Sequence, residues 1–187
     1  PRQVSAMRRI SKYLDTKSRI HLYNAFIMSN FTYCSNVWFF GRKGNVLKLE
    51  NVHKRALRIA LNDYTSSYCE LLDKAKRPSI YVSGLRSVML EFYKYINDVN
   101  PPILGNIFVK VSHQHDTRNS QKVIQPKVNT TSNGLNSFRY QGPRLWNLLP
   151  NTIKCASSVQ EFKSLITQWN GPSCSCGSCT LCKIGCL

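Results

Sequence analysis

The sequence is poor in acidic residues and lacks the patterns through which they catalyse reactions. Only 9 of its 187 residues are Asp or Glu, against 26 Lys and Arg, which gives a formal net charge of +17. Two-metal phosphoryl transfer needs at least two converging carboxylates. The acids are scattered, and the closest pair, Glu70 and Asp73, lies where a helix cap explains it. The chain also has no Gly-rich phosphate loop and no nucleophile elbow, so no catalytic residue is predicted.

The sequence also lacks a secretory signal and a convincing membrane span. Residues 1–11 contain no apolar core of a signal peptide. Residues 22–40 carry no charge, but polar residues interrupt them too often for a span, and a buried helix is expected instead. The chain begins with Pro1 inside a helical pattern, so we interpret it as a piece of a longer protein.

Cysteine is distributed unevenly. Five of the 8 Cys fall in the last fourteen residues, and Cys34, Cys69 and Cys155 are isolated. A secreted disulfide scaffold would spread its cysteines through the fold. We therefore expect an intracellular location, cytoplasmic or nuclear, where thiols stay reduced.

The excess of positive charge indicates a polyanionic partner. A charge of +17 opposes compaction unless salt or a polyanion screens it. Nucleic acid is the commonest partner of this kind, and an anionic membrane surface comes second. We expect nucleic acid (RNA, DNA or a hybrid) and no membrane.

Residues 45–62 (NVLKLENVHKRALRIALN) predict an amphipathic helix. Asn45 is a suitable N-cap, and the pattern ends at Asn62 and Asp63. At about 100° per residue, one arc is apolar: Val46, Leu49, Val52, Ala56, Leu57 and Ala60. The opposite arc is basic, diluted only by Glu50: Lys48, Asn51, Lys54, Arg55 and Arg58. The basic arc is either an ordinary solvent-exposed face or a face that lies against phosphates.

The remaining pattern predicts a mainly α fold. Residues 17–40 and 45–62, joined by a turn at 41–44, should form an antiparallel helical hairpin that organises a helical bundle. A short extended or β segment is expected near 120–141, including a short strand at 137–140, and a Cys-rich tail ends the chain. The predicted domains are residues 1–109, 110–170 and 171–187. The other expected helices cover residues 2–14, 67–76, 80–99, 142–149 and 158–169. Thr16 and Ser79 are expected to cap the helices that follow them, and Pro143 should occupy the first position of its helix. Capping-box patterns open two of these helices, at Ser67–Glu70 and Ser158–Glu161.

If the hairpin closes, its basic residues form one cationic edge. Such an edge would contact backbone charge and would not distinguish base sequence. Tyr13, Tyr64 and Tyr68 lie close enough along the chain to stack on a base or sugar, although aromatics at helix ends more often rim a core. The predicted nucleic-acid-binding residues are Arg8, Arg9, Lys12, Arg42, Lys43, Lys48, Lys54, Arg55 and Arg58.

The tail CSCGSCTLCKIGCL offers candidate metal ligands. Its spacing C-x2-C-x2-C-x3-C matches the iron–sulfur run of bacterial ferredoxins without the closing Pro. Zinc is the more sensible cofactor, and a reduced thiol tail without metal is the alternative. His113 and His115 form a loop pair without a third ligand, whereas His21 and His53 lie on helices and should pack or hydrogen-bond. The candidate zinc ligands are Cys176, Cys179, Cys182 and Cys186.

Three stretches of the chain together resemble a known family. In residues 22–61 the matching positions are Tyr33, Trp38 and Leu49, followed by the run Lys54–Ile59 (KRALRI). Residues 68–104 carry a Glu-Leu-Leu element, a Leu-Arg helix and a Pro-Pro-Ile-Leu close; residues 118–150 include LNSFRYQGPRLWNLLP, with Phe162-Lys163 after them. Together they resemble the C-terminal part of the reverse transcriptase of a LINE-type, jockey-like non-LTR retrotransposon.

The resemblance implies the thumb and post-thumb region of an RNA-directed DNA polymerase of a mobile element. The thumb of such enzymes holds the primer–template duplex by its backbone. The family's catalytic Tyr-x-Asp-Asp motif lies in the palm and is absent here, so this chain should not polymerise alone, and Mg would bind only in the palm of the parent. The rest of the parent polyprotein is an implied partner. The alternatives are a non-enzymatic, zinc-assisted nucleic-acid-binding module and a decayed element fragment without function.

Overall fold

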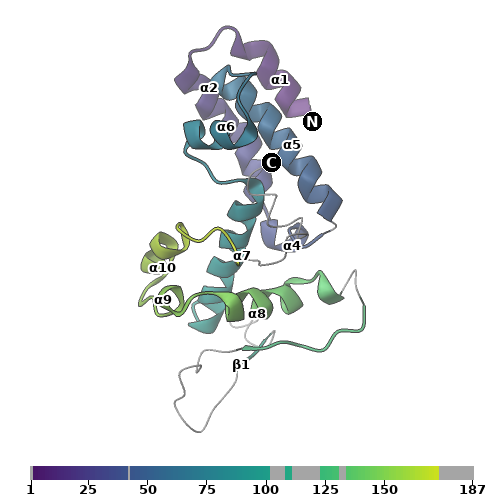
Figure 1. Cartoon of the computed structure of the whole chain (residues 1–187), viewed down its shortest axis with the longest axis vertical. Helices are drawn as coiled ribbons and strands as arrows, with labels where there is room; N and C mark the ends of the chain where they lie inside the picture. Colours follow the sequence, from purple (N-terminus) through teal and green to yellow (C-terminus); the bar gives the residue numbers. More distant parts are fainter. Residues whose placement is uncertain (1, 42, 102–107, 111–122, 131–133, 173–187) are drawn as a thin grey trace. The chain divides into compact units, whose positions relative to one another are not determined.

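The computed structural model of the chain describes residues 2–41, 43–101, 108–110, 123–130 and 134–172 (Figure 1). This part of the chain is mainly helical with almost no strand, as predicted. Its elements are α1 (Arg2–Ser11), α2 (Thr16–Leu22), η1 (Tyr23–Met28), α3 (Ser29–Thr32), α4 (Ser35–Trp38), α5 (Lys43–Leu61), α6 (Tyr68–Ala75), α7 (Ile80–Ile96), β1 (Val109–Lys110), β2 (Val123–Ile124), α8 (Phe138–Leu148), α9 (Asn151–Lys154) and α10 (Val159–Ile166).

The described residues fall into two compact units. The first contains the described residues of 1–35 and 42–84, and the second contains those of 36–41 and 85–172. The division therefore lies within α7, after Gly84. The predicted domain boundaries after residues 109 and 170 lie beside stretches outside the described residues, and they stay predictions.

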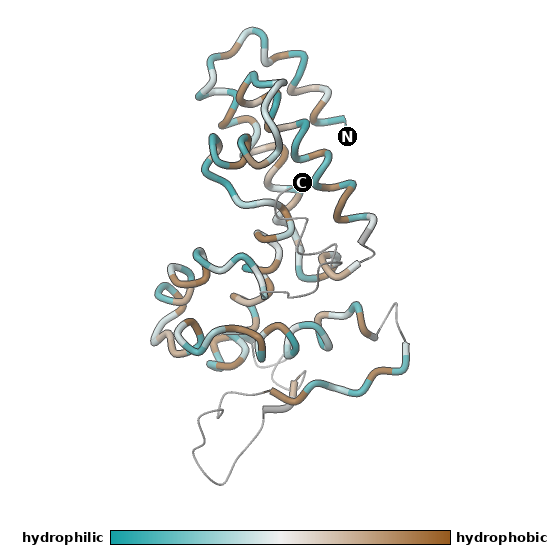
Figure 2. The backbone as a smooth tube through the Cα atoms, in the orientation of Figure 1, coloured by the Kyte–Doolittle hydropathy of each residue, from teal (hydrophilic) through white to brown (hydrophobic). Residues whose placement is uncertain are grey.

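The first unit is built around α5. Helices α1, α2, η1 and α6 pack against α5, and Figure 2 shows hydrophobic and hydrophilic residues alternating along this helix. Burial of the apolar face of α5 stabilises the helix more than helix propensity does, because an isolated helix of this length is only marginally stable in water. The core residues are Val4, Met7, Tyr23, Ile27, Ala56, Leu57, Ile59, Ala60, Tyr68, Leu71 and Leu72.

Helix α5 confirms the predicted amphipathic helix, with one change at its start. It begins at Lys43, so Asn45 is not its N-cap, and it ends at Leu61 as expected. The predicted apolar arc faces inward, because Ala56, Leu57 and Ala60 are almost fully buried. The sequence thus located both faces of this helix through its period of 3.6 residues.

The helix predicted over residues 17–40 is confirmed only in its first part. Segments α2, η1 and α3 follow one another without a gap from Thr16 to Thr32. The helix ends there, since Tyr33 has extended backbone and Cys34 has φ 47, and α4 is a separate short helix. The predicted antiparallel hairpin is not confirmed. The stretch is also not the most buried element, since Tyr33 is 76% exposed and Phe26 58%.

Helices α6 and α7 begin where the sequence placed their caps. The Ser67 hydroxyl accepts the Glu70 N–H (3.3 Å), and the Glu70 carboxylate accepts the Ser67 N–H (3.1 Å), which confirms the capping box. The Ser79 hydroxyl accepts the Val82 N–H (3.2 Å) at the start of α7. Helix α7 ends at Ile96, earlier than the predicted residue 99, before Asp98 adopts φ 55.

The second unit has an aromatic core. Phe92 of α7 lies against Phe108 (ring centroids 4.8 Å apart) and Trp146 of α8 (5.5 Å), and Tyr93 stacks on Phe162 of α10 (4.2 Å). These edge and stacked contacts are the geometries that aromatic rings prefer.

The small sheet confirms the extended segment only near residue 123. Strands β1 and β2 pair antiparallel, with Val109 opposite Ile124. The Asn147 side chain of α8 holds β2 by bonding both the Val123 N–H (3.2 Å) and the Val123 carbonyl (3.1 Å). Residues 111–122 and 131–133 of the predicted segment lie outside the described residues.

Three predictions in the second unit are wrong, and one helix was not predicted. The strand expected at residues 137–140 is the beginning of α8, whose N-cap is Ser137; Pro143 lies inside the helix and not at its first position. The final helix α10 ends at Ile166 rather than 169, and α9 between α8 and α10 was not predicted. In the described part of the chain, no helix is both long and apolar enough to cross a membrane.

Candidate nucleic-acid interface

The outward side of α5 carries the cationic residues that the sequence predicted. Lys48 and Arg55 are exposed, whereas Lys54 and Arg58 are half-buried. They recur at spacings of three, four and seven residues and therefore lie on one side of the helix. We call Lys48, Lys54, Arg55 and Arg58 the cationic face. The side chains of Arg42 and Lys43, also predicted to bind, lie outside what the structure describes.

Helix α1 supplies the predicted flank. Arg8, Arg9 and Lys12 are all exposed, while Val4 and Met7 of the same helix enter the core around α5. Helix α1 therefore packs beside α5 within the first unit (Figure 1). The structure thus places the flank and the cationic face in one compact body, although the two sets come from distant parts of the sequence.

Glu50, the acidic residue that the sequence placed on the cationic face, lies in the interior of the first unit. Glu50 is only 4% exposed. Its carboxylate accepts the hydroxyl of Tyr68 and the backbone N–H groups of Ile80 (3.2 Å) and Tyr81 (2.7 Å). Glu50 therefore caps α7 from inside the unit, where a negative charge complements the helix dipole. The cationic face is consequently more uniformly positive than the sequence suggested.

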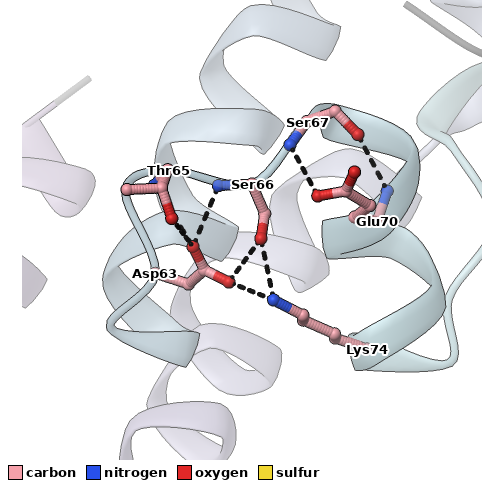
Figure 3. A network of polar contacts seen from close by, with 6 residues as sticks. All are labelled: Asp63, Thr65, Ser66, Ser67, Glu70 and Lys74. Atoms are coloured by element: carbon pink, nitrogen blue, oxygen red, sulfur yellow. Dashed lines mark hydrogen bonds and ion pairs between the residues drawn. The ribbon is translucent and has the colours of Figure 1, made fainter.

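Asp63, the next acidic residue along the chain, also has a structural role. Figure 3 shows its carboxylate accepting hydrogen bonds from Thr65, Ser66 and Lys74 in the loop between α5 and α6. The Lys74 ammonium and the Ser66 hydroxyl hold the pKa of this carboxyl well below its usual range, so Asp63 is ionised and paired. Lys74 rather than the cationic face neutralises it.

Other acids of the first unit cap helices. Asp15, and not the predicted Thr16, is the N-cap of α2, and Glu70 completes the capping box of α6. Within the described parts of the chain, no ion pair is formed by Arg8, Arg9, Lys12, Lys48, Lys54, Arg55 or Arg58. A set of like charges without acidic partners is the electrostatic arrangement expected of a surface that receives an anion.

A buried hydrogen-bond chain lies beneath the cationic face. The Tyr23 hydroxyl donates to Nε2 of the fully buried His53, His53 Nδ1 donates to the Tyr68 hydroxyl (2.6 Å), and Tyr68 donates to Glu50. We assign these directions because the Glu50 carboxylate can only accept, and each following donor is then fixed. The chain ties α5 to η1, α6 and the start of α7.

Burial sets the protonation states of the residues in this hydrogen-bond chain. It lowers the pKa of His53 to about 4, with the positive charge of Arg77 acting in the same direction, so the imidazole is neutral. Burial raises the pKa of Glu50, and the bonds from Tyr68, Tyr81 and Ile80 oppose that rise. The three accepted hydrogen bonds suit the carboxylate form.

The sequence interpretation of this region was right for His53 and wrong for Glu50, and of the two alternatives given for Tyr68 the core position holds. His53 does pack and hydrogen-bond as predicted. Tyr68 is 2% exposed and cannot stack on a base, whereas Tyr13 and Tyr64 are 77% and 55% exposed. Spacing alone places Glu50 and His53 on the buried face of α5, because they share a helix face with Val46, Leu57 and Ala60. Glu50 was assigned to the basic face because its side chain is charged.

The predicted metal ligands cannot be placed. Residues 173–187, with the four candidate cysteines Cys176, Cys179, Cys182 and Cys186, lie outside the described residues, as do His113 and His115. Across the described residues, no group of three or more His, Cys, Asp or Glu could hold a metal ion. His21 is exposed on α2. The zinc site therefore stays a prediction.

No protein-family model matches the chain, and neither a curated protein nor a solved structure shows significant similarity to it.

Proposed function

We propose that this chain binds the sugar–phosphate backbone of nucleic acid as the thumb and post-thumb portion of a reverse transcriptase of a LINE-type retrotransposon. The observation that carries the binding part is the cationic face of α5, which has no ion-pair partner in the described structure. The sequence resemblance supports the parent enzyme. In that role the chain holds primer–template or template RNA, while the catalytic carboxylates and their Mg belong to the palm of the parent.

The dimensions of the cationic face suit a duplex backbone. Ten residues separate Lys48 from Arg58, which corresponds to about 15 Å along a helix. Duplex DNA rises about 3.4 Å per base pair, so this length spans roughly four base pairs. The opposite side of α5 is fixed in the core, so the cationic residues are held on one rigid element.

The experiment is a charge reversal with a matched control. In the test variant, Lys48→Glu and Arg55→Glu reverse two exposed cations of the cationic face. In the control, Arg139→Glu and Lys163→Glu reverse two exposed cations of the second unit and change the net charge equally. Fluorescence anisotropy measures binding of each to a labelled RNA–DNA hybrid between about 50 and 200 mM salt.

The test variant should bind at least about tenfold more weakly, and the slope of log K against log salt should decrease by about 2. The control should change affinity far less at physiological salt, where charges more than about 8 Å apart are screened. Equal losses in both variants would mean that net charge alone drives binding and that α5 is not the interface. Circular dichroism melts verify that both variants fold.

A further inference from the structure

One arginine of the cationic face is held differently from its neighbours. Arg58 is half-buried, and its Nε is covered by protein without a hydrogen-bond partner in the described structure. Arg55, one turn earlier on the same helix, is exposed. A covered donor without an acceptor has lost its water and gained no bond, which is unfavourable and calls for an explanation.

The surroundings of Arg58 supply no countercharge. Asp63 is the next acidic residue along the chain, and its N–H donates to the Arg58 carbonyl (3.0 Å). Its carboxylate, however, is bonded to Lys74 and Ser66 (Figure 3). Lys54 lies one turn before Arg58 and has the same charge, so the two repel each other. The folded chain thus holds a partly desolvated guanidinium beside a like charge and without an anion.

We propose that Arg58 is the anchoring residue of the cationic face and binds one backbone phosphate of the nucleic acid. The proposal rests on the function proposed above. The two terminal nitrogens of the guanidinium are the donors left for a ligand, and their planar arrangement matches two phosphate oxygens. Because Arg58 is half-buried, its side chain has less freedom before binding than the exposed Arg55, so less side-chain entropy is lost when the phosphate arrives.

Lysine cannot replace Arg58 in this role. A lysine keeps the charge but offers a point charge on a flexible stem and no planar pair of donors. Arg139 is an exposed arginine of the second unit and lies outside the cationic face, so the same substitution there should leave binding nearly unchanged. The two arginines should therefore respond differently to the same conservative change.

The experiment compares Arg58→Lys with the control Arg139→Lys in the full chain, using the labelled RNA–DNA hybrid. Both variants keep the net charge of +17. Arg58→Lys should weaken binding about tenfold with an unchanged salt slope, because charge is conserved and geometry is lost. Arg139→Lys should stay within about twofold of the wild type. Equal affinities of the two variants overturn the proposal.

A spectroscopic measurement follows the Arg58 guanidinium itself. Its Nε–H resonance is recorded by nitrogen–proton correlation with and without the hybrid and reports binding at the two terminal nitrogens of the same group. The hybrid should shift this resonance more than that of the control Arg139, and an unmoved Arg58 resonance contradicts the anchor. If the Lys48/Arg55 charge reversal weakens binding while Arg58→Lys does not, only the anchor is wrong. If the wild type binds no hybrid, both proposals fail.

Discussion

Removing the Glu50 carboxylate should destabilise the fold strongly, because three donors converge on it. Its oxygens accept the Tyr68 hydroxyl and two N–H groups at the start of α7, Ile80 (3.2 Å) and Tyr81 (2.7 Å). Glu50→Ala leaves these donors without their acceptor in a site where Glu50 itself is 4% exposed. A buried donor left unsatisfied costs about 1–3 kcal/mol, and breaking a buried charged network about 3–5 kcal/mol.

We therefore expect Glu50→Ala to lower the free energy of unfolding by about 3–5 kcal/mol, less whatever desolvation of the carboxylate is relieved. Glu50→Gln should cost less, about 1–3 kcal/mol, because the amide oxygen can still accept while its NH2 group faces a donor. Urea unfolding followed by circular dichroism measures both. The matched control is Glu91→Ala, which removes a half-exposed ion pair with Lys94 and should cost about 1 kcal/mol.

The same variants distinguish the two locations considered for Glu50. On the cationic face, as the sequence suggested, its removal would leave stability nearly unchanged and strengthen nucleic-acid binding by removing a repulsive charge. Inside the unit, its removal costs stability and does not strengthen binding. A Glu50→Ala variant as stable as the wild type, with tighter binding, would refute the buried network.

Two further predictions concern the interiors of the two units. Burial lowers the pKa of His53 from 6.5 to about 4, so the unfolded chain binds this proton before the folded chain does as the pH falls. The contribution of neutral His53 to stability is therefore complete above pH 6.5 and decreases toward pH 4, with a loss of about 2 kcal/mol at pH 5. Burial raises the pKa of Glu50, which gives stability the opposite dependence on pH, so the effect of His53 is measured as the difference in pH slope between wild type and His53→Gln. In the second unit, a Cβ at Gly142 would lie 2.9 Å from Cδ2 of the fully buried Phe92, and Gly142→Ala should cost about 1–3 kcal/mol in urea unfolding. Gly44→Ala, where a Cβ meets nothing within 4 Å, is its control and should be neutral or stabilising; equal effects at the two glycines contradict this packing.

Local patterns predicted those features that depend on local physics. The starts of α6 and α7 follow from Ser67, Glu70 and Ser79, because a cap is a contact over three residues. The two faces of α5 follow from its period. The pattern over residues 17–40 predicted the helical run that ends at Thr32 but not the break at Tyr33 and Cys34, where the backbone leaves the helical conformation.

The sequence predicted which cationic residues lie on the outward side of α5, but it did not predict the buried hydrogen bonds beneath them. An exposed lysine such as Lys48 needs only the correct side of a helix, which periodicity supplies. The chain from Tyr23 through His53 and Tyr68 to Glu50 joins residues that are 30, 15 and 18 positions apart. No pattern in a single sequence specifies which distant polar groups meet, because that depends on how the helices pack. The covered Nε of Arg58 is likewise a product of packing.

The positive charge of the first unit is unbalanced because its acids are used within the fold. Glu50 and Asp63 satisfy interior or loop donors, and Asp15 and Glu70 cap helices. Ser or Asn would cap a helix about as well as Asp, so capping alone does not require these charges. What matters for binding is that none of these four carboxylates pairs with the cationic face, so its repulsion remains in the folded state. If the chain binds nucleic acid as proposed, a phosphate backbone would relieve that repulsion, and we therefore expect binding to raise the stability of the first unit.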